Sequence, residues 1–245
     1  MPRPRTRPTV LAAALLFAAL GALLGWSLRP GTAARPEPVG LFTSLPLIWG
    51  EGEDPQQLLA SGQSPHRAKQ ALAAIGPIRP LDTLDGLQPG LKRLVIAQPR
   101  PLSPTENVAL DNWLRRGGQL LLLADPMLTE PSVFPLGDPR RPQDIVLLSP
   151  ILTRWKLELT FDEQQPAGVR LVAADGLTIP VNLAGTWRSV GATCRIAGAG
   201  VLAICQVGQG RLVALADAEV LSAHDNGQLR QDALAGLLRR AFSTP

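Results

Sequence analysis

The stretch LKRLVIAQPRPLSPTENVALDNWLRRGGQLLLLAD, residues 91–125, decides the fold. Its residues 94–97 are a short apolar run, suited to a strand buried on both faces. The SPTE sequence at 103–106 is a capping box with proline in the first turn, so a helix begins there. The glycine pair 117–118 ends that helix, and residues 120–124 form a second buried strand. The stretch therefore predicts a right-handed parallel βαβ unit.

Outside this unit, short apolar runs alternate with helix-like stretches, the pattern of an α/β domain with a mostly parallel sheet and flanking helices. Further strands are predicted at residues 39–43, 78–81, 157–161, 169–173, 177–183 and 211–216. Further helices are predicted to begin at Ser64, Ser149 and Gln228. Four prolines within residues 129–144 predict a surface excursion near the end of a strand.

The composition indicates one packed domain and argues against a nucleic-acid-binding surface. The 245 residues are 45% hydrophobic and 18% charged, which excludes a wholly disordered chain. The net charge is +4, but Arg3, Arg5, Arg7 and Arg29 hold four of the 24 basic residues, which leaves 20 basic and 20 acidic residues beyond them. A charge-balanced body without tyrosine is poorly suited to a phosphate backbone.

The leading segment predicts a membrane anchor. Residues 10–28 are 19 uncharged residues, about 28 Å as a helix, which is enough to cross a bilayer. We expect a cytoplasmic basic flank at 1–9, a linker at 29–38 and an extracytoplasmic domain at 39–245, in a single-pass protein of the bacterial inner membrane. A cleavable signal peptide is the alternative, because small residues stand at 32–34.

Two further patterns concern pairing. Gly21 and Gly25 form a GxxxG motif, which allows a homodimer through the apolar segment, although small residues also recur by chance there.

Cys194 and Cys205 flank a predicted β-hairpin. A two-residue turn at 199–200 places them opposite each other, at a hydrogen-bonded position with Cα atoms about 5.5 Å apart. A disulfide and two buried free thiols both remain open.

Asp125 and Asp217 are the best-placed carboxylates. Each ends an apolar run predicted to be a parallel strand, and ligand crevices form outside the carboxyl ends of such strands. The alternative is that each aspartate caps the following turn. A metal cluster with Glu219, His224 and Asp225 is a weaker hypothesis, since Asp225 is also a natural helix cap. We therefore predict no metal site.

The sequence lacks the common catalytic signatures. It has no GxSxG, GxGxxG or GxxxxGK[ST] motif. Neither cysteine lies at a strand-to-helix turn, and His66 and His224 are distant in sequence, so a Cys-His couple has little support. ATP hydrolysis, if the protein depends on it, belongs to another chain.

Several segments together resemble a known family. They are residues 41–46 (LFTSLP), 94–99 (LVIAQP), 102–106 (LSPTE), 117–121 (GGQLL), 125–126 (DP) and 210–213 (GRLV), followed by Asp217. This set is similar to the auxiliary domain of uncharacterised ABC-type transport systems, including gliding-motility-type auxiliary proteins and DUF4350-like proteins. The resemblance covers roughly residues 39–240.

The resemblance implies a class I glutamine-amidotransferase-like, Rossmann-like fold with a C-terminal β-hairpin. It also implies a non-catalytic subunit without a cofactor, working beside an ABC permease and an ATPase, and the amidotransferase nucleophile has no counterpart here. Candidate cleft residues are Thr43, Ser44, Trp49, Glu51, Asp125 and Asp217. An amidotransferase-like envelope hydrolase and a tethered small-ligand sensor remain alternatives.

Overall fold

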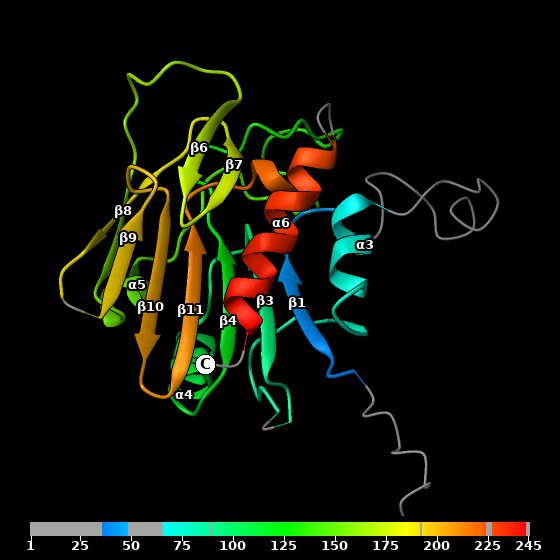
Figure 1. Ribbon diagram of the computed structural model, residues 1–245. Coiled ribbons are helices and arrows are strands. Elements are labelled where there is room, and N and C mark those ends of the chain that lie inside the picture. Colours follow the sequence, from blue (N-terminus) through cyan, green and yellow to red (C-terminus); the bar gives the residue numbers. More distant parts are fainter. Residues whose placement is uncertain (1–35, 49–65, 89, 192, 224–226, 244–245) are drawn as a thin grey trace, which may run out of the picture. The chain divides into compact units, whose positions relative to one another are not determined.

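The computed structural model describes residues 36–48, 66–88, 90–191, 193–223 and 227–243, which belong to one compact unit (Figure 1). A seven-stranded sheet forms its centre. In spatial order the strands are β2 (Ile78–Pro80), β1 (Val39–Thr43), β3 (Arg93–Ala97), β4 (Gln119–Leu123), β11 (Gly210–Leu215), β10 (Leu202–Val207) and β9 (Cys194–Ala197). The first five are parallel, whereas β10 and β9 run antiparallel to their neighbours.

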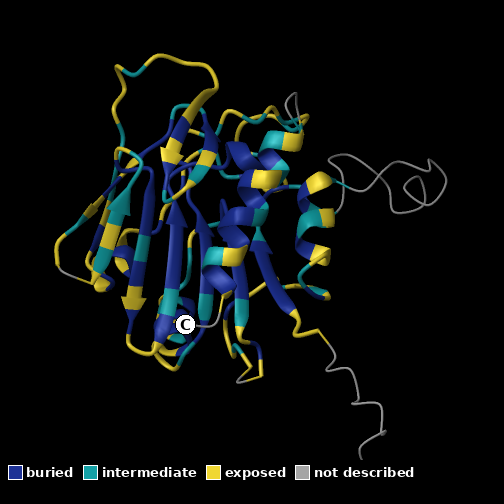
Figure 2. Cartoon of the chain, viewed as in Figure 1, coloured by how far each residue is buried: buried dark blue, intermediate teal, exposed yellow. Residues whose placement is uncertain are grey.

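Helices cover both faces of this sheet. α3 (Arg67–Ala73) and α6 (Gly227–Phe242) pack on one face, and α4 (Pro104–Arg115) and α5 (Ser149–Arg154) pack on the other. Leucines alternate along β4, with Leu121 and Leu123 in the first core and Leu120 and Leu122 in the second. Figure 2 shows the central strands buried between these layers. Burial on both faces explains the continuous apolar runs in the sequence.

The predicted strand-helix-strand unit is confirmed. β3 and β4 are parallel, in a register that pairs Arg93 with Gln119. Ser103 caps α4, and Glu106 completes the capping box by accepting a hydrogen bond from the Ser103 N–H at 2.9 Å. Gly117 takes the left-handed conformation after the helix, with φ at 104°. Local sequence signals therefore determine both ends of α4.

Two smaller antiparallel sheets complete the structure. β5 (Leu157–Thr160) pairs with β8 (Thr186–Ser189), and β6 (Arg170–Ala174) pairs with β7 (Leu177–Val181). A short 3-10 helix, η1, follows the main sheet at Glu219–Leu221. The sequence analysis predicts β5, β6 and β7 but not β8, whose four residues TWRS carry no apolar run.

The expected fold class is wrong. The main sheet is mixed, because the hairpin of β9 and β10 joins the parallel strands by pairing antiparallel with β11. The two small sheets are also absent from that expectation. The error has a physical origin, since a buried antiparallel strand and a buried parallel strand share the same apolar run.

The expected membrane topology also needs correction. No helix in the described part of the chain is both long enough and apolar enough to cross a membrane. The expected transmembrane helix and the single-pass inner-membrane location therefore find no support in the described residues. The predicted span at 10–28, with Gly21 and Gly25, lies outside the described residues, as do the flank at 1–9 and linker residues 29–35.

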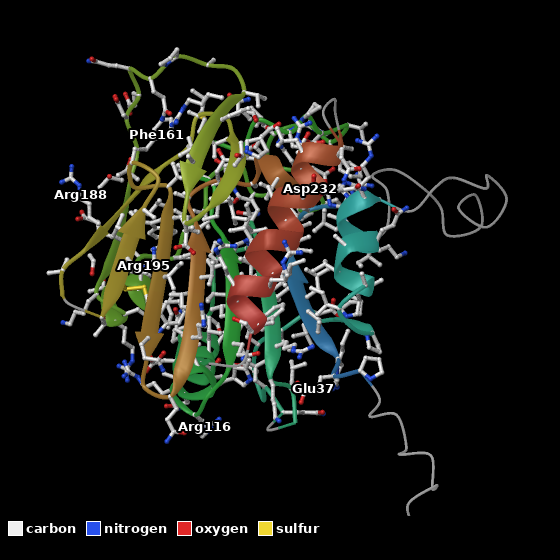
Figure 3. All side chains as sticks on the ribbon, viewed as in Figure 1. Glu37, Arg116, Phe161, Arg188, Arg195 and Asp232 are labelled. Carbon is white, nitrogen blue, oxygen red and sulfur yellow. A yellow bond between two sulfur atoms is a disulfide. The ribbon has the colours of Figure 1, made fainter. Side chains whose placement is uncertain are left out.

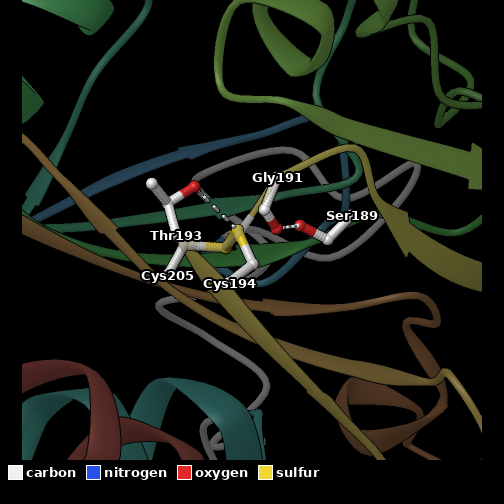
Figure 4. The surroundings of a disulfide bond; sticks show 5 residues. All are labelled: Ser189, Gly191, Thr193, Cys194 and Cys205. Atoms are coloured by element: carbon white, nitrogen blue, oxygen red, sulfur yellow. Dashed lines mark hydrogen bonds between the residues drawn. A yellow bond between two sulfur atoms is a disulfide. The ribbon is translucent and has the colours of Figure 1, made fainter.

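Cys194 and Cys205 form a disulfide that joins β9 to β10 (Figure 4). The register opposes the two cysteines as the sequence predicts, but their Cα atoms are 4.0 Å apart, so the predicted hydrogen-bonded position is wrong. The Gln206 N–H donates to the Thr193 carbonyl at 3.0 Å, which places the adjacent cysteine pair at a narrow, non-hydrogen-bonded site. The β9–β10 loop has four residues, 198–201, whereas the prediction assumed a two-residue turn. Hydrogen-bonded and non-hydrogen-bonded pairs alternate along the two strands, and the longer loop shifts this alternation by one residue.

Candidate functional site

The candidate site lies at the carboxyl edge of β1, β3, β4 and β11. Because these strands are parallel, their carboxyl ends meet at one edge of the sheet, where open α/β folds bind ligands. Ser44, Gln98, Asp125 and Asp217 follow the four strands in that order. The structure therefore brings together three of the residues predicted from sequence and adds Gln98.

The Gln98 side chain connects the segments that meet at this edge through hydrogen bonds. Its side chain is fully buried, and its backbone has a φ of 42°, which is uncommon for a residue other than glycine. The Nε2 group donates to the carbonyls of Asp125 at 3.0 Å and Gln143 at 2.7 Å, and Oε1 accepts from the Asp125 N–H at 2.9 Å. The sequence analysis missed Gln98, although its position directly after a buried strand was an available signal.

Ser44 and Thr43 support the loop that follows β1. The Ser44 hydroxyl donates to the Gln98 carbonyl at 2.5 Å and accepts from the Gln143 N–H at 3.0 Å. Thr43 Oγ1 accepts from the Leu45 N–H at 2.9 Å, a local turn contact. Both hydroxyls are therefore engaged within the chain.

Asp125 and Asp217 are buried and bind backbone amides. Asp125 accepts from the N–H groups of Met127 at 2.9 Å and Ala218 at 3.2 Å. Asp217 accepts from the N–H groups of Glu219 at 2.5 Å and Asn182 at 2.8 Å. Each carboxylate oxygen thus has a backbone donor, which is the capping arrangement described above as the alternative to ligand binding.

Burial changes the acidity of both aspartates. It raises the pKa of Asp125 to about 6, with a smaller contribution from the nearby Glu219 charge, against the opposing effect of the two backbone donors. Burial raises the pKa of Asp217 well above its ordinary value, and the negative charge of Asp125 adds to the effect. Burial therefore favours the protonated form of both carboxyl groups, and the charge of Asp125 adds to this effect at Asp217.

A buried ion pair lies beside the aspartates. Arg230, on α6, donates through Nε to the Glu219 carbonyl and to Glu219 Oε1, both at 3.1 Å. The two side chains are 5% and 8% exposed. Because removing either partner would leave the other charge buried, this pair fixes α6 against η1.

One small cavity at this edge is lined by described residues. It has a volume of about 30 Å³, roughly that of one water molecule, and His66 and Glu130 are among its lining residues. His66 caps α3, because its Nδ1 accepts from the Ala68 N–H at 3.2 Å, and burial lowers its pKa. The cavity cannot hold a ligand of metabolite size.

The other predicted site residues have different outcomes. Trp49 and Glu51 lie outside the described residues, as do His224 and Asp225 of the weaker metal hypothesis. Within the described ranges, no group of three or more His, Cys, Asp or Glu side chains could hold a metal ion. Cys194 and Cys205 are bonded to each other, so neither offers a thiol.

Comparison with known proteins gives a likeness of fold only. No family model matches the chain, and no curated protein matches it. Among solved structures, the exo-beta-1,4-mannosidase Op5Man5 from Opitutaceae bacterium strain TAV5 has a TM-score of 0.51 at 14% identity, over 86% of this chain and 36% of that one. Gan42B, a GH42 beta-galactosidase from G. stearothermophilus, has a TM-score of 0.50 at 15% identity, over 86% of this chain and 30% of that one.

A cold-adapted beta-galactosidase from Rahnella sp. R3 is similar at a TM-score of 0.50 and 14% identity, over 93% of this chain and 34% of that one. The chain therefore spans about a third of the length of these structures. These likenesses cover only part of each glycoside hydrolase and show a likeness of fold alone.

Proposed function

We propose that this chain is a non-catalytic binding domain, which serves as an auxiliary subunit of an ABC-type transport system. The observation that supports the non-catalytic part is the closure of the carboxyl edge among the described residues. Ser44, Gln98, Asp125 and Asp217 all bond within the chain, and the cavity beside them has room for about one water molecule. A domain with this edge closed acts through its outer surface.

The ABC-type partner rests on the sequence resemblance. The similar segments include residues 41–46, 94–99 and 117–121, which contribute to β1, β3 and β4. We propose that a permease and an ATPase of such a system are the partners of this chain. The disulfide argues against the rival cysteine hydrolase, because a nucleophilic cysteine needs a free thiolate.

Affinity purification of the tagged full chain from its native host, in mild detergent, tests this proposal. We expect permease and ATPase chains to co-purify with it and to be absent when an unrelated chain with the same tag is used. Recovery of the chain without any transporter component would contradict the ABC-type assignment.

A second measurement tests the non-catalytic part separately. We expect the purified chain to leave amide and glycosidic model substrates unchanged. Turnover that disappears in Asp217→Asn but persists in Asp232→Asn, an exposed aspartate on α6, would contradict a non-catalytic domain.

A further inference from the structure

A groove of about 460 Å³ lies between α3 and α6, which are neighbours in Figure 1. Arg93, the first residue of β3, also lines it, so the groove lies toward the amino edge of the sheet. Its volume is within the range of about 300–1,000 Å³ that small-molecule sites occupy. The groove is therefore separate from the closed carboxyl edge and large enough for a ligand.

The walls of the groove are mostly aliphatic. On α6, Ala235, Leu238 and Phe242 follow one another at i, i+3 and i+7, so they form an apolar stripe about 10 Å long on one face of the helix. Leu238 and Phe242 are buried and give the groove an apolar floor. Ala71 and Ala74 line the α3 side, and their small side chains keep the space between the helices open. A long, narrow apolar groove of this kind suits an extended hydrocarbon chain.

Two guanidinium groups border the same groove. Arg239, on the last turn of α6, is exposed, and no acidic side chain of the described ranges pairs with it. Arg93 Nε is buried and has no hydrogen-bond acceptor among the described residues, since Glu37 Oε2 is 3.6 Å away. Figure 3 shows Glu37 at the end of the domain where α6 ends, whereas Asp232 lies nearer the start of that helix.

The charge around this end of the groove is positive. Lys92, at 3.2 Å, and Arg93 share the single carboxylate of Glu37. Arg211 lies two strands from Arg93 in the same register, and its Nε is also buried without a described acceptor. The last carbonyls of α6 carry only partial negative charge, which the full charges of Arg93 and Arg239 exceed. An anionic group therefore complements this end of the groove.

We propose that the groove binds an aliphatic carboxylate from free solution, a single hydrocarbon chain with one anionic end. The carboxylate pairs with Arg239 and Arg93, because planar guanidinium groups match carboxylate geometry. The hydrocarbon chain lies along the stripe formed by Ala235, Leu238 and Phe242. This site goes beyond the function proposed above and does not depend on the ABC-type partner.

Titration calorimetry of the purified full chain with dodecanoate tests the carboxylate contact. We expect Arg239→Gln to raise the dissociation constant about tenfold, because a charge-assisted hydrogen bond is lost. Arg116→Gln is the matched control, since Arg116 is exposed at the end of α4 and does not line the groove. Equal affinity in Arg239→Gln and the unmodified chain, with matching circular dichroism, overturns the proposal.

Dodecanol separates charge pairing from apolar adhesion. The alcohol has the same hydrocarbon chain but no charge, so we expect weaker binding that Arg239→Gln leaves unchanged. An effect of Arg239→Gln that is as large for dodecanol as for dodecanoate overturns the proposal, because it reports a change of shape and not of charge.

Chain length and a blocking side chain test the apolar stripe. Octanoate lacks four methylene groups of dodecanoate, so we expect it to bind at least about tenfold more weakly. Ala74→Trp fills the groove from an exposed position and should weaken dodecanoate binding to a similar extent. Ala73→Trp, at an exposed position of α3 outside the groove, should leave it unchanged. Affinity that responds neither to chain length nor to Ala74→Trp overturns the proposal.

Two further measurements identify the source and the place of binding. Binding to phosphatidylglycerol vesicles without binding of free dodecanoate, at up to about 1 mM, overturns the proposal, because the ligand is then a lipid surface. A photoreactive analogue of dodecanoate should label residues 71–75 or 235–243, as mass spectrometry of the digested chain would show. Label confined to residues 10–28 overturns the proposal as well.

Discussion

At the scale of single residues, Asp125 couples stability to pH. Its folded-state pKa of about 6 lies above the ordinary value for aspartate, because burial favours the protonated form. The folded chain therefore binds more protons than the unfolded chain between about pH 4 and pH 6. The contribution of Asp125 to the free energy of unfolding thus falls as the pH rises through that range.

We expect Asp125→Asn to flatten this dependence. The free energy of unfolding of the unmodified chain decreases between pH 5 and pH 7, and the variant shows a smaller decrease. At pH 5 the variant is less stable by about 1–2 kcal/mol, because the amide cannot accept from both Met127 and Ala218. Urea unfolding at the two pH values measures both effects.

Asp232→Asn is the matched control, since Asp232 is exposed on α6. It should leave the pH slope as it is in the unmodified chain. An unchanged slope in Asp125→Asn would show that Asp125 does not titrate in this window.

The sequence predicts the positions of the candidate residues and the local turn contacts of the two aspartates, but not their long-range contacts. The rule that ligands bind beyond parallel strands selects Ser44, Asp125 and Asp217, and the structure places these three residues at one edge of the sheet. Their hydrogen bonds with Gln143, Asn182 and Ala218 come from segments far away in sequence. No local pattern encodes such contacts, so the closure of the edge could not be foreseen.

At the scale of elements, α4 approaches β11 unusually closely. A Cβ atom added at Gly210 would collide with the carbonyl oxygens of Leu114 and Gly118. These oxygens belong to the end of the helix and the start of the next strand, which cannot move independently. Glycine at this position therefore sets the distance between the helix layer and the sheet.

We expect Gly210→Ala to lower the free energy of unfolding by about 3 kcal/mol, because backbone must shift to admit the methyl group. Gly90→Ala is the matched control, since a Cβ there meets open space. It should change stability by less than about 0.5 kcal/mol. If Gly210→Ala and Gly90→Ala change the free energy of unfolding equally in denaturant titrations, the close approach of α4 to β11 does not determine the effect of a methyl group at position 210.

The β9–β10 disulfide should stabilise its hairpin. Cys194 and Cys205 are 11 residues apart in sequence, and closing so short a loop contributes about 2–3 kcal/mol. We expect the double variant Cys194→Ala, Cys205→Ala to lose that amount in thermal or urea unfolding. Reduction of the unmodified chain should cause a similar loss. If the double variant is destabilised but the reduced chain is not, the stability comes from packing around the buried Cys205 and not from the disulfide.

Elements with strong local signals, and the pairings of β3 with β4 and of β9 with β10, could be predicted, but pairings between strands distant in sequence could not. The capping box and the glycine pair determine α4 from within the segment itself. β8 has no such signal, and its place beside β5 depends on contacts with Trp187 and its neighbours in the folded core. The antiparallel pairing of β10 with β11 also escaped prediction, because buried antiparallel and buried parallel strands share the same apolar run.

At the scale of the whole domain, one sheet separates two apolar cores. Trp113, Trp155 and Trp187 all belong to the core on the α4 and α5 side. The core on the α3 and α6 side contains no tryptophan among the described residues. Fluorescence from these three residues therefore reports on one face, whereas circular dichroism reports on both.

We expect the two cores to unfold together because they share the strands between them. Leu237→Ala, a fully buried change on α6, should lower stability by about 2–5 kcal/mol and shift fluorescence and circular dichroism midpoints equally. Val108→Ala, at a 57% exposed site on α4, should leave both midpoints in place. A shift in circular dichroism alone would show that the faces are independent.

The order of strands also constrains how a nascent chain matures. β11 lies between β4 and β10, although it is the last strand in the sequence. Until residues 210–215 leave the ribosome, the leucine row of β4 has no neighbour on that side. Residues 210–215 must therefore be synthesised before the two halves of the sheet join, and until then the exposed edge of β4 is the surface that chaperones would protect.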